Sequence, residues 1–166
     1  MGSILLEGAI DPLNFINIQT NDFDAGFEQK RLLESSPKVG AVVCFTGLVR
    51  DFEAQAPIDA LSIQHYPGMT EKLLKEIVSQ ANERWDLLGM TVIHRIGSLR
   101  PTEQIVLVAV AAQRRAPAFE AAQFVMDYLK TRATLWKRVS QGEKRRWLEQ
   151  KQSDTDAAAR WDRARD

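Results

Sequence analysis

The stretch MTVIHRIGSLRPTEQIVLVAVAAQ, residues 90–113, decides the fold because it predicts two apolar strands joined by a short turn. Residues 90–99 and 103–113 are rich in β-branched and other apolar side chains, and the turn between them is RPT. Neighbouring strands of this kind can pair antiparallel. The pattern therefore favours an α+β fold over a doubly wound parallel sheet.

Further strands and helices alternate along the rest of the chain. The expected strands cover residues 14–20, 39–50 and 60–66, and the expected helices cover residues 24–36, 67–85 and 117–132. Residues 51–59 have no apolar period and are expected to form a mobile loop. Residues 134–140 and 144–151 flank the turn QGE and predict a small hairpin.

The domain organisation follows from length and composition. The chain has 166 residues, 45% of them hydrophobic and 13 of them aromatic, which suits one domain with its own core. We expect that domain over residues 1–153, with the hairpin as a small element at about 134–151. The charged tail, residues 154–166, is expected to be either a short helix or disordered. No apolar run approaches the roughly 20 residues of a membrane span, and no signal peptide is recognisable, so a cytoplasmic location is expected.

The net charge is zero, but the charges are unevenly distributed. Residues 1–109 carry 9 basic and 14 acidic side chains, whereas residues 110–166 carry 13 basic and 8 acidic ones. The basic C-terminal third favours an anionic ligand or an acidic partner. The excess of positive charge is too small to indicate a nucleic-acid-binding protein.

Two lysines of this basic third stand beside apolar residues. Lys130 lies at the border of the apolar face of the helix expected at 117–132, and Lys137 is predicted to share one side of a strand with Leu135 and Val139. Two interpretations are open. Either the aliphatic part of each lysine lies on apolar surface and its ammonium group is solvated, or the two ammonium groups lie at the mouth of a pocket. In a pocket, apolar surroundings would lower a lysine pKa and suit it to acid–base chemistry or anion binding.

Three arginines stand where strands end. Arg114 and Arg115 lie between a predicted strand and the start of a helix, where free N–H groups already attract anions. They form either a phosphate or carboxylate clamp or an ordinary solvated turn. Arg50 ends the FTGLVR strand and is either a ligand-binding group or an ordinary edge arginine.

Metal and thiol chemistry receive little support from the sequence. His65 and His94 come from different predicted strands, and no cysteine or carboxylate cluster has ligand spacing with them, so no metal site is expected. Cys44, the only cysteine, lies in the apolar run VGAVVCFTG and is expected to be a buried structural thiol. The alternative is a persulfide carrier, although a reactive thiolate needs a positive, partly exposed site. No cofactor is expected.

Five segments of the chain form a distinctive set: GAVVCFTGLVR, HYPGMTEKLLKEI, VIHRIGSL, AFEAAQFVMDYLKTRATLWKR and a late RW. The set covers roughly residues 39–150 and resembles the MoaE family, the large, catalytic subunit of molybdopterin synthase. This resemblance implies an α/β hammerhead-like domain with a small added antiparallel β subdomain. It makes residues 1–153 a MoaE-like catalytic domain.

The resemblance also implies a reaction and its partners. The family's enzyme adds two sulfur atoms to cyclic pyranopterin monophosphate, which gives the dithiolene of molybdopterin. The sulfur arrives as a thiocarboxylate on the C-terminal Gly-Gly of a small ubiquitin-like subunit of the MoaD type. The large subunits form a homodimer with one small subunit at each end, which gives a heterotetramer.

The resemblance assigns roles to the basic residues. Lys130 and Lys137 match the family's two active-site lysines. Arg138 is expected to help neutralise the anionic substrate. The other expected substrate-binding residues, which match positions in or lining the family's site, are Arg50, Arg114, Arg115, Phe45 and Met126. The family commonly has histidine at the position of Arg114, so this chain keeps a positive donor there but lacks a group that moves protons near neutral pH.

Two other functions stay open on the sequence alone. One is a Cys44-dependent sulfurtransferase, in which the thiol carries the sulfur. The other is a non-catalytic scaffold that binds an acidic ubiquitin-like partner through the basic C-terminal third. Substitution of Cys44 separates the first from the synthase, and turnover with the pterin separates the second.

Overall fold

The structure, a computed structural model, describes residues 12–162 and confirms the expected α+β fold. The elements in chain order are β1 (Leu13–Gln19), α1 (Ala25–Leu33), β2 (Ala41–Leu48), β3 (Phe52–Glu53), β4 (Ala56–Pro57), β5 (Ala60–His65), α2 (Met69–Arg84), β6 (Leu87–Arg95), β7 (Gly97–Leu99), β8 (Gln104–Ala112), α3 (Arg115–Thr131), β9 (Leu135–Gln141), β10 (Lys144–Trp147) and α4 (Gln152–Ala159). These elements build two four-stranded sheets and one two-stranded ladder.

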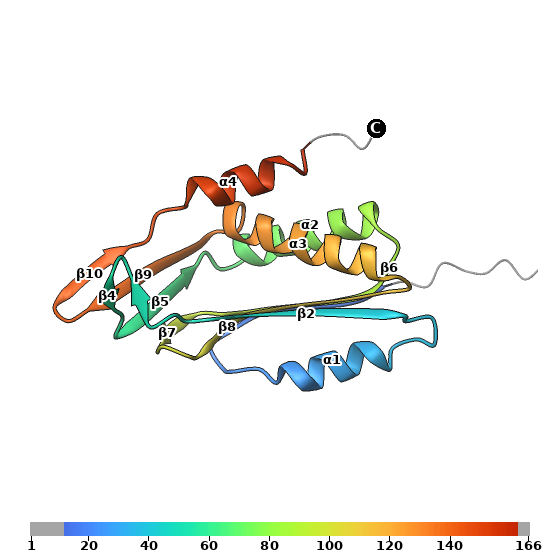
Figure 1. Cartoon of the computed structure of the whole chain (residues 1–166), viewed down its shortest axis with the longest axis horizontal. Coiled ribbons are helices and arrows are strands. Elements are labelled where there is room, and N and C mark those ends of the chain that lie inside the picture. The colour runs from blue at the N-terminus through green and yellow to red at the C-terminus, as the bar shows by residue number, and fades with distance from the viewer. Residues whose placement is uncertain (1–11, 163–166) are drawn as a thin grey trace, which may run out of the picture.

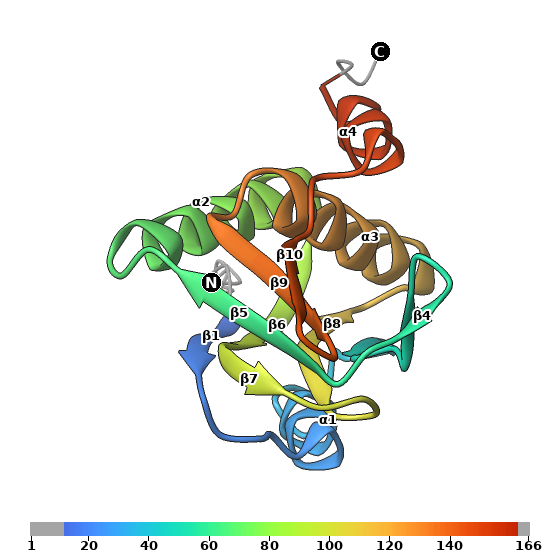
Figure 2. The ribbon, with the colours of Figure 1, turned by 90° about the vertical axis from the view of Figure 1, so that its left-hand side faces the viewer.

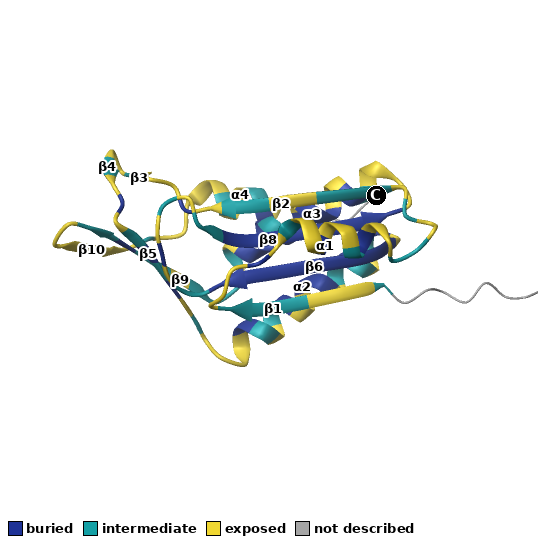
Figure 3. Cartoon of the chain, turned by 90° about the horizontal axis from the view of Figure 1, so that it is seen from below, coloured by how far each residue is buried: buried dark blue, intermediate teal, exposed yellow. Residues whose placement is uncertain are grey.

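The first sheet has the strand order β1-β6-β8-β2 and forms the body of the molecule. The predicted antiparallel pairing of the opening stretch is confirmed, because β6 pairs with β8 in that sense. β8 also pairs antiparallel with β2, whereas β1 pairs parallel with β6. α2 and α3 cover one face of this sheet, and α1 covers the other (Figure 1). The two central strands, β6 and β8, are buried along almost their whole length (Figure 3).

Successive side chains of β6 and β8 point to opposite faces of the first sheet and so contribute to two separate apolar layers. Met90 and Val92 belong to the main core, together with Leu74 of α2 and Phe124 of α3. The residues that point the other way, Ile93 among them, pack on the α1 side in smaller clusters. A strand whose two faces are both covered is apolar at most of its positions, which explains why this stretch lacks the usual alternation of polar and apolar residues.

The second sheet has the order β10-β9-β5-β7 and lies at one end of the first (Figures 1 and 2). All its neighbouring strands pair antiparallel, and the predicted hairpin is confirmed as β9 and β10. The prediction of one continuous strand over residues 90–99 is wrong. Gly97 has φ +90°, a left-handed conformation that favours glycine, and there the chain leaves β6 for β7 in the second sheet.

Residues 51–59 are not the irregular loop that the sequence predicted. They contain the two-residue strands β3 and β4, which pair antiparallel around a turn at Ala54 and Gln55, both with positive φ. The amide of Gln141 in β9 donates to the carbonyl oxygens of Glu53 and Ala56, at 2.9 and 3.1 Å. The sequence missed this hairpin because its strands are too short to show a period.

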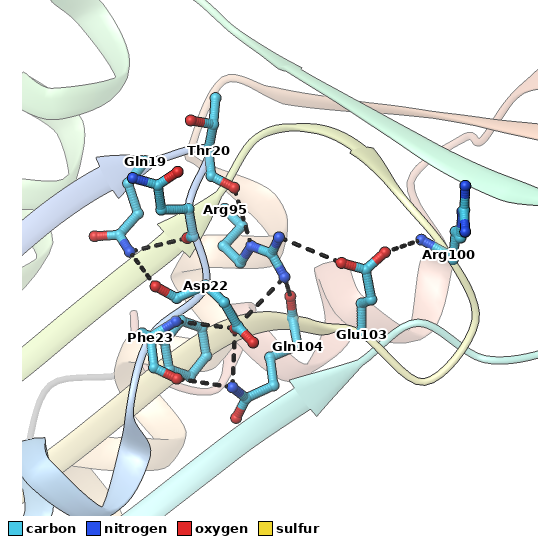
Figure 4. Close-up of polar contacts among 9 residues, drawn as sticks. Gln19, Thr20, Asp22, Phe23, Arg95, Arg100, Glu103 and Gln104 are labelled. Carbon is cyan, nitrogen blue, oxygen red and sulfur yellow. Dashed lines mark hydrogen bonds and ion pairs between the residues drawn. The ribbon is translucent and has the colours of Figure 1, made fainter.

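Arg95 ties the end of β6 to two neighbouring segments (Figure 4). Its side chain is only 8% exposed, and it forms ion pairs with Asp22 at 3.5 Å and with Glu103 at 3.4 Å. It also donates to the carbonyl oxygens of Thr20 and Gln104. Paired charges with additional hydrogen bonds are the form in which an ionised arginine tolerates burial. The network therefore fixes the junction from which both sheets extend.

Residues 152–162 pack against α3. Trp161 stands edge-on to Trp85 and Phe124, with ring centroids 5.7 and 5.6 Å apart. The buried carboxylate of Asp127 in α3 accepts hydrogen bonds from the indole of Trp161 and from Arg160. Of the two forms that the sequence left open for the segment after Ser153, residues up to Ala159 adopt the helical one as part of α4.

Candidate active site

The two lysines lie where α3 leads into the second sheet. Lys130 is the penultimate residue of α3, and its side chain is 49% exposed. Lys137 is the third residue of β9 and stands opposite Ile63 of β5. Leu135 and Val139, which share its face of the strand, pack against the main core. Lys137 therefore lies on the core-facing side of β9, the side that the alternation in the sequence predicted, and it is partly buried there.

Burial lowers the pKa of Lys137 below the ordinary value of a lysine, and the positive charges of Lys130 and Arg50 lower it further. The carboxylate of Asp154 acts in the opposite direction. Within residues 12–162, no carboxylate forms an ion pair with Lys137. An ammonium group in such surroundings gives up its proton more readily than a solvated one. Lys137 is thus suited to donate and recover a proton during a reaction.

Arg50 lies two residues after the end of β2 and is the third member of this group. Its guanidinium forms an ion pair with Glu53 of β3, with 2.7 Å between Nη2 and Oε2. The backbone just before it is fixed, because the N–H of Val49 donates to the carbonyl oxygen of Glu103 at 2.9 Å. We call Arg50, Lys130 and Lys137 the cation cluster, since the charge of each of the other two bears on Lys137.

Arg138 does not join the cation cluster on this chain. It is the neighbour of Lys137 on β9, and successive residues of a strand point to opposite faces. Its guanidinium carbon lies 5.4 Å from the ring centroid of Trp147, its cross-strand partner on β10. The Nε atom is buried and has no hydrogen-bond partner within residues 12–162.

Arg114 and Arg115 lie at the opposite end of α3 from Lys130. Arg114 is the N-cap residue and Arg115 is the first residue of the helix, and both are exposed. At a rise of about 1.5 Å per residue, the 15 residues from Arg115 to Lys130 span about 22 Å. A single chain therefore does not bring the arginine pair to the cation cluster.

Phe45 and Met126 lie on the two elements that lead into the cation cluster. Phe45 belongs to β2, the strand that Arg50 follows, and its side chain is exposed. Met126 is one helical turn before Lys130 on α3 and packs partly against the main core. Both positions are compatible with lining a site next to the cations.

Cys44 is exposed, so the prediction of a buried thiol is wrong. It lies on β2, an edge strand of the first sheet, and the apolar run around it does not imply burial on both faces. Partial desolvation raises the pKa of the thiol. A raised pKa disfavours the thiolate, which is the nucleophilic form that a persulfide carrier needs.

Sequence reasoning missed two groups beside Lys137. His94 is fully buried on β6, its Nδ1 lies 2.8 Å from the carbonyl oxygen of Arg95, and burial together with the charge of Lys137 lowers its pKa to about 3. Asp154 of α4 lies 3.5 Å from the ammonium of Lys130. The period-two spacing of Met90, Val92 and His94 is a signal that puts the histidine on the core side. The Ala-rich context of Asp154 carries no comparable signal.

Within residues 12–162, no group of three or more His, Cys, Asp or Glu side chains could hold a metal ion. None of the helices described over the same residues has the length and apolar character needed to cross a membrane.

In this α+β fold, two lysines and an arginine lie together at one end of the main sheet. Such a group of side chains is typical of a site that binds an anion and moves protons. The family described as MoaE protein matches residues 18–132, well over half of the chain. The chain therefore belongs to the MoaE family.

Relatives and solved structures agree with this assignment. The molybdopterin synthase catalytic subunit of Escherichia coli K12 is 52% identical over 139 residues, which are 84% of this chain and 92% of that protein. The structure of the molybdopterin biosynthesis MoaE protein from Burkholderia ambifaria is similar with a TM-score of 0.78 and 43% identity, over 92% of this chain and all of that one. A complex of subunits 1 and 2 of molybdopterin-converting factor from Helicobacter pylori is similar with a TM-score of 0.66 over 82% of this chain and 91% of that one. At 18% identity, it shows the shared fold alone.

Proposed function

We propose that the chain is the catalytic subunit of molybdopterin synthase. In this role it transfers sulfur from the thiocarboxylated C-terminus of a small ubiquitin-like subunit to cyclic pyranopterin monophosphate, and so forms the dithiolene of molybdopterin. The observation that carries the proposal is the inward-pointing Lys137, desolvated beside Lys130 and Arg50. Such an arrangement is costly for stability, and it is useful where an anion binds and a proton moves.

The two lysines divide the work according to their exposure. Lys130 is half exposed at the end of α3, so its ammonium is accessible to the incoming C-terminal tail of the small subunit. There it stabilises the negative charge that develops at the thiocarboxylate carbonyl. Lys137 is desolvated and has a lowered pKa, so it supplies the proton to the departing oxygen of the pterin.

The arginines neutralise the anionic substrate. Arg50 lies next to the lysines and is already oriented by Glu53, so it is the candidate to bind the phosphate or a developing oxyanion. Arg138, on the opposite face of β9, has a buried Nε with no partner among the described residues, and an additional acceptor would satisfy it. Phe45 and Met126 supply apolar contacts to the flat pterin ring.

The distant pair Arg114 and Arg115 is compatible with the proposed homodimer. About 22 Å of helix separates this pair from Lys130 on the same chain, so the pair contributes to a substrate site only if a second copy presents it. We therefore propose that Arg114 and Arg115 bind the substrate held by the partner protomer. Arg114 supplies charge there and moves no proton, because a guanidinium stays protonated.

The proposed sulfur donor is a small ubiquitin-like subunit of the MoaD type, one bound at each end of the homodimer. The similar Helicobacter pylori structure is itself a protein–protein complex, of subunits 1 and 2 of molybdopterin-converting factor. The basic C-terminal third of this chain suits an acidic partner. We also propose a cytoplasmic location for the heterotetramer.

Reconstitution tests this function. The full chain is mixed with thiocarboxylated small subunit and cyclic pyranopterin monophosphate, and molybdopterin is measured for wild type, Lys130→Ala and Cys44→Ser. We expect product from wild type and from Cys44→Ser, and none from Lys130→Ala, although that variant still folds and binds the small subunit.

The other outcomes separate the competing functions. Loss of product in Cys44→Ser would support a thiol-dependent sulfurtransferase. Binding of the small subunit without product from wild type would support a scaffold. Normal turnover by Lys130→Ala would remove the lysine from the mechanism.

A further inference from the structure

The ion pair between Lys130 and Asp154 joins the cation cluster to the C-terminal helix. Lys130 Nζ lies 3.5 Å from Asp154 Oδ1, and the side chain of Asp154 is only 25% exposed. Asp154 lies in the first turn of α4, a different element from those that carry the three cations. We propose that Asp154 is a positioning residue of the active site, which holds the Lys130 ammonium beside Lys137; this inference rests on the function proposed above.

The helix that carries Asp154 is held in place by contacts on its C-terminal side. Asp127 of α3 binds both Arg160 and Trp161, and the carboxylate of Asp162 accepts from the hydroxyl of Tyr128 at 3.1 Å. Ala158 is buried in the main core. A helix fixed in this way holds the carboxylate of Asp154 at a defined distance from α3.

The charges around Lys137 show why a carboxylate matters there. Lys130 from α3 and Arg50 from the end of β2 both disfavour its charged form, and the buried neutral His94 of β6 supplies no negative charge. Asp154 of α4 is the group that favours the charged form. The same carboxylate therefore holds one lysine by contact and helps the other to keep its proton by proximity.

This arrangement assigns α4 a task in the reaction. If Lys130 must meet the incoming thiocarboxylate in a fixed position, a carboxylate on a rigid helix limits the rotamers of its long side chain. If Lys137 must be protonated in order to donate a proton, the nearby negative charge helps, because it keeps Lys137 protonated up to a higher pH. Replacement of Asp154 should therefore alter both the rotamers of Lys130 and the pH range over which Lys137 is protonated, without unfolding the chain.

The test compares Asp154→Asn with Asp154→Glu and with the control Asp156→Asn. Asp156 lies on the same helix and is exposed, and its carboxylate accepts a hydrogen bond from Gln152 instead of pairing with a lysine. On the full-length chain, competitive acylation with acetic anhydride across a pH series, read by peptide mass spectrometry, gives the titration of Lys130 and Lys137 separately. Product formation across the same pH series is measured in the reconstituted heterotetramer.

We expect Asp154→Asn to move the titration of Lys137 to lower pH, because the carboxylate that favours its charged form is lost. The alkaline limb of the activity profile should move in the same direction, with roughly a tenfold loss of turnover near pH 7. Asp154→Glu should recover most of both properties, and Asp156→Asn should behave as wild type. Unchanged lysine titration in Asp154→Asn, or equal changes in Asp156→Asn, would overturn the proposal.

The two measurements, lysine titration and product formation, distinguish a failure of this inference from a failure of the proposed function. The acylation measurement needs neither substrate nor partner, so it reports on Asp154 even if wild type forms no molybdopterin. A chain that shows the titration shift but forms no product would contradict the proposed function and retain the electrostatic pairing. A chain that forms product with no shift in any variant would retain the function and exclude Asp154.

Discussion

The two sheets of this protein differ in how much of their surface they bury. In the first sheet, β6 is buried at every position and β8 at all but its first. In the second sheet, β10 is exposed throughout, and Val139 is the one fully buried residue of β9. The first sheet is covered by helices on both faces (Figure 1), whereas the second sheet carries Lys137 on β9. The most deeply buried strands therefore lie in the first sheet, whereas Lys137, the proposed proton donor, lies in the second.

The largest expected effect on stability comes from the first sheet. Met90 of β6 has no exposed surface and lies in the main core, so Met90→Ala should lower the free energy of unfolding by about 2–5 kcal/mol. The matched change in the second sheet, Trp147→Ala, removes a half-exposed side chain and should cost less than about 1 kcal/mol. Denaturant unfolding of both variants measures the difference. Equal losses in the free energy of unfolding would show that the side chains of the two sheets are packed equally well.

Lys137→Met sharpens the comparison by separating stability from activity. Lys137 is a desolvated ammonium with no ion pair among the described residues, and methionine is an apolar side chain of similar length. The replacement should therefore raise the free energy of unfolding, on the order of 1 kcal/mol. Urea unfolding at neutral pH measures this change. A loss of stability in this variant would mean that Lys137 makes favourable contacts that its burial does not suggest.

The same lysine should give the wild-type protein a pH-dependent stability. Its folded-state pKa lies below the ordinary 10.5, so between the two values the unfolded chain binds more protons than the folded one. The free energy of unfolding should therefore rise with pH through that window and level off above it. Unfolding curves of wild type and Lys137→Met from about pH 8 to 11 test this, because the variant should lack this contribution to the rise.

The N-cap of α1 should give a smaller effect. The carboxylate of Asp24 accepts from the N–H of Phe27 at 2.9 Å, and α1 covers only one face of the first sheet. Asp24→Ala should lower the free energy of unfolding by about 1 kcal/mol. Asp24→Asn is the control, since asparagine caps a helix equally well. A null result for Asp24→Ala would show that α1 adds little to the first sheet.

The smallest effect on stability is expected from Glu53→Gln. The side chain of Arg50 is largely exposed, although that of Glu53 is not, and an ion pair with an exposed partner contributes between 0 and about 1 kcal/mol. The change should instead weaken catalysis, because Arg50 loses the group that orients it. Thermal unfolding and the Michaelis constant for the pterin, measured on one preparation, check both expectations. A strongly destabilised variant would show that β3 and β4 belong to the core.

The difference between the sheets also explains what the sequence could predict. The central pair of the first sheet was predictable, since a strand covered on both faces is a nearly continuous apolar run, and the paired strands over residues 90–113 are such runs. The inward direction of Lys137 was predictable too, because alternation with Leu135 and Val139 is a local property. The break at Gly97 was not predictable, because the apolar pattern continues across it while the chain changes sheets.

Other features of the site could not be predicted, because they depend on contacts between segments that are distant in the sequence. Asp154 meets Lys130 only because α4 folds back along α3, and no period in the tail indicates this. His94 looks like an ordinary strand residue until the second sheet places Lys137 near it. Arg114 and Arg115 look like neighbours of the lysines in sequence, but the rigid length of α3 separates them within one chain.

The most direct test of this account is product formation by Lys137→Met. Molybdopterin is measured in the reconstituted complex, with the unfolding free energy of the same preparation as the control. We predict a chain at least as stable as wild type whose turnover falls by about 10²-fold or more. A stable Lys137→Met variant that forms molybdopterin at the wild-type rate would contradict the claim that the second sheet holds this lysine for the reaction.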